Sequence, residues 1–328
     1  METILKVENL YVKNKEVEIL RDISFDIKKG EILGIVGESG CGKSTLIRSL
    51  IAMNENNEEI VKGDISFKSK SILNMPQKEM RKLRGSEIGV VFQNPGSTLN
   101  PIRKIGKQFI ESLKSHNKIS KKEALAKAES ILEKVNLKDA KCILNSYPYE
   151  LSGGMKQRVA MAMALIMEPE ILVADEPTSA LDVTVQAQVV KEMMKLRDSF
   201  DTSIIIVTHS MGVVSSMVDK IAVMYAGCIV EYGDKESILK NPKHPYTEAL
   251  INAIPKLNGK LPIGIKGNPP SFQLENEGCS FFPRCSKGNK ECLVRNQQLN
   301  YIGDNRWIAC SYIEEMEKEK NERNNIAV

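Results

Sequence analysis

Hydrophobic and polar positions along this chain follow two different periods. Alternation of apolar and polar side chains, the pattern of antiparallel strands with one buried face, runs through residues 3–12, 17–27 and 63–68. Continuous apolar runs, typical of strands buried on both faces of a parallel sheet, occupy residues 31–36, 88–92, 171–174 and 203–207. The chain is therefore predicted to be an α/β protein with a parallel core and a smaller antiparallel sheet.

The period becomes helical between residues 104 and 164. One apolar face there is formed by Ala124, Ala128, Ile131 and Val135. Because this block is inserted between two predicted core strands, it is expected to form a helical subdomain over about residues 94–164. The turn-rich segment 94–101 suits a hinge at its start.

The first core strand leads into a phosphate-binding loop. Residues 37–44, Gly-Glu-Ser-Gly-Cys-Gly-Lys-Ser, match the pattern G-x-x-x-x-G-K-[ST] between a predicted strand and a predicted helix. The glycines let successive N–H groups point at one anion, and the helix dipole adds to that field. Lys43 is expected to reach the β- and γ-phosphates, and Ser44 to offer its hydroxyl to Mg²⁺. A Gly-rich turn with a chance lysine would not match every position in this context.

Two carboxylates follow a later core strand. Asp175 and Glu176 end the apolar run that begins at residue 171. Beside a phosphate loop, Asp175 is the expected holder of Mg²⁺, and Glu176 is placed to orient or deprotonate a water aimed at the γ-phosphate. Alone, the pair would fit a strand that simply ends in a polar turn.

A second helix start suited to an anion lies between these two motifs. Ser152, Gly153 and Gly154 lead into a predicted helix over residues 155–167. One phosphate loop needs only one such terminus, so the second indicates contact with another nucleotide, most simply across a dimer. In isolation the three residues would be an ordinary N-cap serine with flexible glycines.

Together these motifs resemble those of the ATP-binding subunit of an ABC transporter. The resemblance covers about the first 240 residues in the family's order, and it adds Gln93 (Q-loop), residues 179–182 (D-loop) and His209 (H-loop). It implies a P-loop ABC ATPase fold in which two subunits face each other head to tail. Each ATP would lie between the phosphate loop of one subunit and residues 152–154 of the other.

The resemblance also implies roles for single residues. Gln93 would contact Mg²⁺ and the attacking water, His209 would hold the γ-phosphate, and Asp182 would bridge the subunits. The other nucleotide contacts are expected from Gly37, Glu38, Ser39, Gly40, Cys41, Gly42, Lys43, Ser44 and Thr45, and from Ser152, Gly153 and Gly154. At the position of the family's adenine-stacking aromatic the chain has Asn14, and nearby Tyr11 fits an ordinary sheet aromatic.

Composition limits the partners. Lys and Arg number 46 against 42 Asp and Glu, a formal charge of +4 with no basic stripe in the sequence, which argues against nucleic acid. The N-terminus has no signal-peptide pattern, and the longest apolar run, residues 159–167, is too short to cross a membrane. The expectation is a soluble protein, peripheral at the cytoplasmic face of the cell membrane, that reaches the membrane only through partners.

Four of the seven cysteines cluster near the C-terminus. Cys279, Cys285, Cys292 and Cys310 are spaced C-x5-C-x6-C-x17-C. A cytosolic chain keeps thiols reduced, so a soft metal centre is favoured over disulfides. Zinc sites usually contain C-x2-C pairs, whereas a Cys₄ iron–sulfur cluster tolerates looser spacing. Spacing alone leaves an iron–sulfur cluster, zinc and no metal open.

The C-terminal region resembles the extension found in oligopeptide and dipeptide importers, a group to which nickel importers are closely related. The resemblance lies in residues 244–250 (His-Pro-Tyr-Thr-Glu-Ala-Leu), 278–281 and 284–285. This resemblance implies a [4Fe–4S] cluster on the four cysteines, with zinc as the alternative. It also implies two membrane-spanning permease subunits, a second ATP-binding subunit that is identical or a paralogue, and an extracytoplasmic solute-binding protein. The expected divisions are an ATPase domain at 1–243, the cysteine-containing region at 244–312 and a charged tail at 313–328.

The expected function is ATP-driven import of oligopeptides or dipeptides, with nickel or another small solute as the alternative cargo. A soluble ABC ATPase acting on nucleic acid or ribosomes would generally carry two nucleotide domains or a long coiled-coil insertion. A metal-binding regulator that merely keeps the fold would not need Glu176 and His209.

Overall fold

The computed structural model describes residues 2–94, 98–178, 183–254, 264–270, 272 and 278–313. The chain divides into two compact units that alternate along the sequence. Unit 1 comprises Met1–Lys6, Asp26–Ile32 and Ser66–Thr208, and unit 2 comprises Val7–Phe25, Leu33–Ile65 and His209–Val328.

The N-terminal strands form an antiparallel sheet that contributes residues to both units. Its strands, in the order β2-β1-β4-β5, are β1 (Thr3–Asn14), β2 (Val17–Lys28), β4 (Glu58–Phe67) and β5 (Lys70–Ser71). The alternation predicted β1 and β2 correctly. Strand β4 begins earlier than the predicted residue 63, because its first residues have no buried apolar face that a hydrophobic pattern could mark.

Three parallel strands form the sheet of unit 1. They are β6 (Ile88–Val91), β7 (Ile171–Asp175) and β8 (Ser203–Thr208), with β7 paired to both of the others. Every residue of β7 and β8 is buried, which is why their sequences are continuous apolar runs. The prediction of a parallel core is confirmed here.

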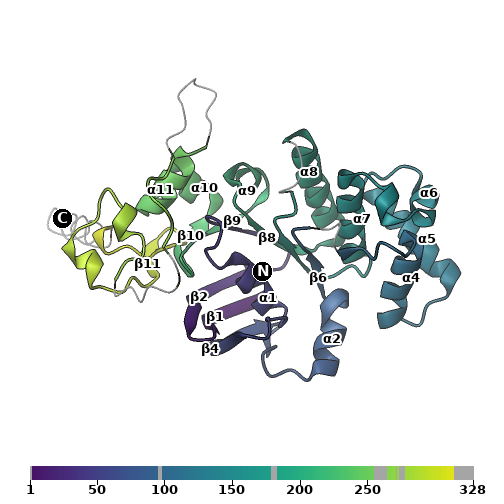
Figure 1. The fold of residues 1–328 in the computed structure, drawn as a ribbon, viewed down its shortest axis with the longest axis horizontal. Helices are drawn as coiled ribbons and strands as arrows, with labels where there is room; N and C mark the ends of the chain where they lie inside the picture. The colour runs from purple at the N-terminus through teal and green to yellow at the C-terminus, as the bar shows by residue number, and fades with distance from the viewer. Residues whose placement is uncertain are drawn as a thin grey trace. The chain divides into compact units, whose positions relative to one another are not determined.

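Unit 1 contains helices within the predicted helical block at residues 104–164, and two further helices, α2 and α8, outside it (Figure 1). They are α2 (Gln77–Ser86), α4 (Ile105–His116), α5 (Lys121–Lys134), α6 (Ala140–Asn145), the 3₁₀ turn η1 (Pro148–Glu150), α7 (Gly153–Leu165) and α8 (Val183–Phe200). Helix α5 starts at a capping box in which Ser120 and Glu123 satisfy each other's backbone N–H groups. The predicted apolar face of this helix, Ala124, Ala128, Ile131 and Val135, is buried.

Unit 2 contains a mixed sheet that the C-terminal strands extend. Strand β3 (Ile32–Val36) is parallel to β9 (Lys220–Tyr225), and the order from there is β9-β10-β12-β11, with antiparallel β10 (Cys228–Asp234), β12 (Arg306–Ile308) and β11 (Asn300–Gly303). The helical elements are α1 (Lys43–Leu50), α9 (Met211–Met217), α10 (Lys235–Lys240), α11 (Pro245–Asn252) and the 3₁₀ turns η2 (Phe282–Arg284) and η3 (Lys290–Leu293). No helix in the described part of the chain is long and apolar enough to cross a membrane.

A buried ion pair fastens strand β12 to strand β10. The side chains of Arg306 and Glu231 are 5% and 0% exposed, and the Arg306 Nε donates to Glu231 Oε1 at 3.0 Å. Glu231 also accepts the backbone N–H groups of Lys243 and His244, each at 3.0 Å. Because a buried carboxylate is tolerated only when it is paired and hydrogen-bonded, Glu231 joins three chain segments at one point.

We expect Arg306→Ala to destabilise the C-terminal part of unit 2 by about 3–5 kcal/mol, because it leaves the Glu231 charge buried and unpaired. Hydrogen exchange of the β10 and β12 amides measures this loss. The control is Lys287→Ala, which removes an exposed ion pair to Glu248 and is expected to cost at most about 1 kcal/mol. Equal effects of the two substitutions would contradict the role of the buried pair.

Candidate functional site

The phosphate loop in unit 2 joins strand β3 to helix α1. Gly40 and Gly42 have φ angles of +77° and +100°, in the left-handed region that favours glycine. A Cβ at Gly37 would lie 2.3 Å from the carbonyl oxygen of Met224, so only glycine lets strand β9 approach the loop this closely. The loop glycines of the motif are therefore required by the backbone itself.

Lys43 is buried inside this loop. Its Nζ donates to the carbonyl oxygens of Gly37 and Glu38, at 2.9 Å and 2.8 Å. Burial raises the pKa of the neighbouring Cys41 thiol, which therefore stays protonated beside the ammonium group. The first N–H groups of α1 have no partner within the helix, and its first turn has no acidic residue, so this end of the helix attracts anions.

The two hydroxyl residues after Lys43 differ in their environment. Ser44 is exposed, whereas Thr45 is buried and its hydroxyl donates to Glu58 Oε1 at 3.0 Å. Arg48 donates both to Glu58 and to the Thr45 oxygen, so the threonine side chain is held away from the loop. Any contact of Thr45 with a nucleotide would come from its backbone N–H, one of the unpaired donors of the first helical turn.

In unit 1 the structure brings together Gln93, Asp175 and Glu176. Asp175 is buried at the end of β7, and the next residue, Glu176, accepts a hydrogen bond on its Oε2 from the Gln93 amide at 3.1 Å. The backbone N–H of Glu176 donates to the Val207 carbonyl at 2.8 Å. Glu176 has a φ of +43°, an uncommon conformation for a residue with a side chain, and such backbone strain concentrates at functional sites.

The predicted second anion site, also in unit 1, lies at the start of α7. Ser152 is the N-cap, and its Oγ accepts the N–H of Met155 at 3.4 Å. Ser152 and Gly153 are exposed, and a Cβ at Gly153 would meet no atom within 4 Å. The side chain of Gln157 donates to the Pro177 carbonyl, which ties this helix to the segment that follows Glu176.

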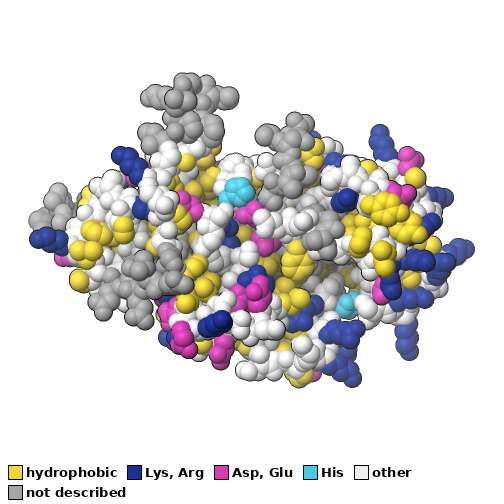
Figure 2. All heavy atoms as spheres, viewed as in Figure 1, with side chains coloured by type: hydrophobic (Ala, Val, Ile, Leu, Met, Phe, Trp, Pro, Cys, Tyr) yellow, Lys and Arg dark blue, Asp and Glu magenta, His cyan; other side chains and the backbone are white. Residues whose placement is uncertain are grey.

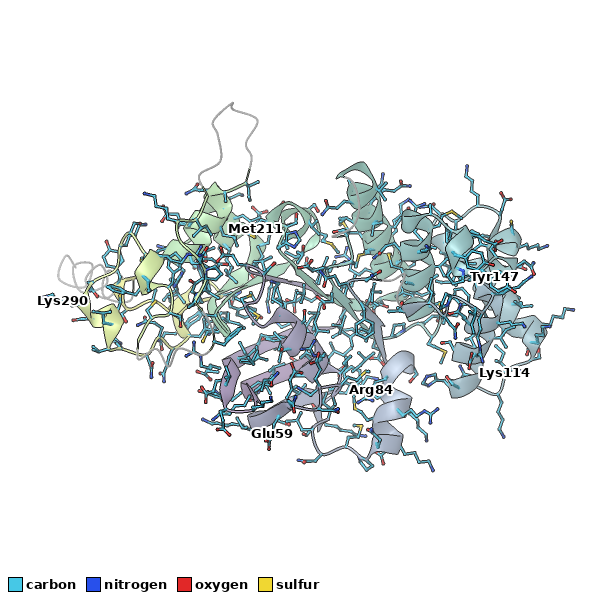
Figure 3. The ribbon with its side chains drawn as sticks, in the orientation of Figure 1. Glu59, Arg84, Lys114, Tyr147, Met211 and Lys290 are labelled. Atoms are coloured by element: carbon cyan, nitrogen blue, oxygen red, sulfur yellow. The ribbon has the colours of Figure 1, made fainter. Side chains whose placement is uncertain are left out.

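The remaining predicted ATP-site residues are placed as follows. His209 belongs to unit 2 and is exposed, two residues before Met211, the first residue of α9 (Figure 3). Asp182 and the rest of the predicted D-loop lie outside the described residues. Tyr11 lies beside a cavity of about 680 Å³ in unit 2, with the Lys62 ammonium 5.0 Å from its ring centre.

The four clustered cysteines of unit 2 line one small cavity of about 10 Å³, room for about one water molecule. The backbone N–H of Cys279 donates to the Cys292 carbonyl at 2.7 Å. Burial raises the pKa of Cys279 to about 12 and that of Cys310 to about 11, and the neighbouring thiols add to both shifts. Among the described residues, no group of three or more His, Cys, Asp or Glu is arranged to hold a metal ion.

Comparisons with known proteins agree with this architecture. A family described as ABC transporter matches residues 20–179, and one described as Oligopeptide/dipeptide transporter, C-terminal region, matches residues 230–292. Among solved structures, cbiO1 from Clostridium perfringens superposes with a TM-score of 0.65 at 30% identity, over 74% of this chain and 92% of that one. The dimeric ATP-binding cassette MJ0796 bound to ADP and Pi superposes with a TM-score of 0.63 at 27% identity, over 71% of this chain and 99% of that one. The fold and its motifs define a P-loop ATPase of the ABC class.

Two curated relatives narrow the class further. The dipeptide transport ATP-binding protein DppD of Lactococcus lactis is 43% identical over 86% of this chain and 83% of its own length. The oligopeptide transport ATP-binding protein OppD of Haemophilus influenzae is also 43% identical, over 90% of this chain and 93% of its own length. The chain belongs to the oligopeptide/dipeptide branch of the ABC transporter ATP-binding family, and its enzymatic activity is ATP hydrolysis.

Proposed function

We propose that this chain is the ATP-hydrolysing motor subunit of an importer for oligopeptides or dipeptides. One observation carries the cargo class: the oligopeptide/dipeptide C-terminal region is matched in the same chain as the ABC ATPase. Two relatives with both high identity and high coverage are named for dipeptide and oligopeptide transport. ATP would close a dimer of two such subunits, the membrane subunits would switch, and hydrolysis would reopen the dimer.

The phosphate loop would bind the phosphates of ATP. Its N–H groups and those at the start of α1 would face the phosphate oxygens, and Lys43 would exchange its loop carbonyl partners for the β- and γ-phosphates. The donors expected for Mg²⁺ suit a hard cation, because the Ser44 hydroxyl, the Asp175 carboxylate and the Gln93 amide all offer oxygen. The exposed side chain of Ser44 supports this assignment. When bound, Mg²⁺ would neutralise phosphate charge.

Hydrolysis would depend on Glu176. Its carboxylate would orient or deprotonate the attacking water, with Gln93 holding one carboxylate oxygen as it does in the hydrogen bond at 3.1 Å. His209 would hold the γ-phosphate and Asp182 would contact the opposing subunit, whose residues 152–154 would face the nucleotide. The strained backbone at Glu176 supports its role in hydrolysis, and the open surface at Gly153 supports the contact of residues 152–154 with a nucleotide.

We expect Glu176→Gln to bind ATP normally, to hydrolyse it at least about a hundredfold more slowly, and to accumulate as a closed dimer, because the amide cannot accept the water's proton. Phosphate release and size-exclusion chromatography with ATP measure the two effects. Glu133→Gln, an exposed position in α5, is the matched control and should behave as the wild type. Wild-type turnover of Glu176→Gln would exclude this residue as the base.

The membrane partners would dock on the helical segment of unit 1. Among the described residues there, Ile102 and Tyr149 are 82% and 67% exposed, and Tyr149 stacks on Tyr147 at 5.4 Å (Figure 3). Figure 2 shows hydrophobic side chains at this surface, flanked by Lys and Arg. Such a patch suits protein contact. We assign this patch to contact with the two permease subunits. A second ATPase, identical or paralogous, would complete the complex. The chain would then be peripheral at the cytoplasmic face of the membrane.

Affinity purification of the tagged chain from its own membranes, under anaerobic conditions and with mass spectrometry, tests the importer assignment. We expect two multi-span proteins, a second ATPase and a solute-binding protein whose bound ligand is a peptide. A bound nickel ion or other small solute would replace the peptide cargo but keep the importer. Recovery of the chain alone in the soluble fraction, or with ribosomes, would overturn transport altogether.

The four-cysteine shell would hold a [4Fe–4S] cluster, with zinc as the alternative. Four thiols around one cavity supply the soft donor set that such a cluster requires, and a bound metal would reverse the raised pKa of Cys279 and Cys310 by stabilising their thiolates. The cavity is small, so loading requires the shell to open. We propose this assignment together with a division of the chain at residues 243 and 312.

We expect Cys292→Ser to lose bound iron and sulfide and to make residues 278–313 more sensitive to proteolysis, since this small region would lose its cross-link. Metal analysis, visible absorption and limited proteolysis of anaerobically purified protein measure this. Cys142→Ser, at an exposed cysteine in α6, is the control. Zinc in the wild-type protein would favour the alternative, and unchanged protection of residues 278–313 would contradict a structural role.

A further inference from the structure

Glu38, the second residue of the phosphate loop, is held by two separate parts of the C-terminal region. The guanidinium of Arg284, in η2, donates to both carboxylate oxygens, at 2.6 Å and 3.0 Å. The hydroxyl of Tyr246, in α11, accepts the backbone N–H of Glu38 at 3.0 Å. All three residues belong to unit 2.

Arg284 is itself fixed in place. Its side chain is 4% exposed, and its Nε donates to the Lys266 carbonyl at 2.8 Å. One terminal nitrogen also donates to the Tyr225 hydroxyl at 3.3 Å. The Glu38 side chain is 25% exposed, so this bidentate, charge-assisted pair is partly shielded and is screened by solvent less than an ordinary surface ion pair.

Tyr246 is equally constrained. It is fully buried, and its ring packs against those of Tyr225 and Phe281, with centroids 4.6 Å and 5.3 Å away. The hydroxyl that meets the Glu38 N–H is therefore held by a rigid aromatic cluster.

Glu38 connects these anchors to the lysine of the loop. Its carbonyl oxygen accepts from Lys43 Nζ at 2.8 Å and from the Cys41 N–H at 3.4 Å. The side chain, N–H and carbonyl of Glu38 are thus all engaged, the first two by the C-terminal region and the third by the loop itself. A shift of Glu38 would move an acceptor of Lys43 and change the curvature of the loop.

We infer that Arg284 is a positioning residue for ATP binding, which acts by fixing Glu38 and, through it, the phosphate loop and Lys43. Tyr246 acts with it on the same residue. The C-terminal region is then part of the ATP-binding machinery rather than an appendage. This inference rests on the ATP site proposed above but is independent of the cargo.

A double-mutant cycle on the full-length chain tests this inference. Arg284→Gln and Glu38→Gln should each raise the Kd for ATP about tenfold, since each removes a hydrogen-bonded charge pair. The double variant should be no weaker than either single variant, because both lose the same interaction. The KM for ATP hydrolysis should rise in parallel, while kcat at saturating ATP changes by less than about twofold.

A merely structural role would give a different pattern. An unchanged Kd for Arg284→Gln, or additive losses in the double variant, would overturn the inference. Glu248→Gln, which removes an exposed ion pair of the same C-terminal region, is the matched control and should leave Kd unchanged. Should Arg284→Gln fail to fold, Tyr246→Phe removes only one hydroxyl and should raise Kd about fivefold. An unchanged Kd for that variant would exclude the action of Tyr246.

Lys43→Ala separates this inference from the ATP site on which it rests. Loss of ATP binding in Lys43→Ala with an unchanged Kd in Arg284→Gln would reject the inference alone. Normal ATP binding by Lys43→Ala would reject the ATP site itself and the inference with it.

Discussion

The arrangement of unit 2 follows from the need to keep a buried lysine paired inside a tightly curved loop. Lys43 carries its charge into a buried position and is held there by the carbonyl oxygens of Gly37 and Glu38. The loop lies directly against strand β9, where the Met224 carbonyl leaves no space for a side chain at residue 37. The Gly227 N–H adds a hydrogen bond to the Cys41 carbonyl at 3.0 Å, so the turn between β9 and β10 also supports the loop.

Where burial is complete, the sequence predicts structure well. Strands β3, β7 and β8 are buried along their whole length, and the apolar runs at residues 31–36, 171–174 and 203–207 mark them closely. The motifs that follow β3 and β7 and the one that begins α7 carry equally local signals, since a glycine pattern, a pair of carboxylates and an N-cap serine depend on neighbours in the chain. The hydrogen bond between Gln93 and Glu176 joins residues that are 83 positions apart. The family resemblance predicted a role for each of them at the same nucleotide, but not their contact with each other.

Pairings between distant charged residues could not be predicted in the same way. Arg284 and Glu38 are 246 residues apart, and Arg306 and Glu231 are 75 apart. In sequence none of these residues signals its partner, and only the folded chain brings the members of each pair together. Strand β12 illustrates the same limit, because it is short and contains the buried Arg306, so no hydrophobic period reveals it.

The C-terminal region gains its order from contacts rather than from regular structure. Within the described residues 278–313, regular structure consists mainly of the 3₁₀ turns η2 and η3 and the strand pair β11–β12, elements too short to be stable alone. Burial keeps Cys279 and Cys310 protonated, so a metal bound by the proposed four-cysteine shell would have to displace protons, and its affinity would weaken as the pH falls. Turn η2 lies between Cys279 and Cys285 and ends at Arg284. One three-residue turn therefore both separates two of the clustered cysteines and carries the guanidinium that holds Glu38.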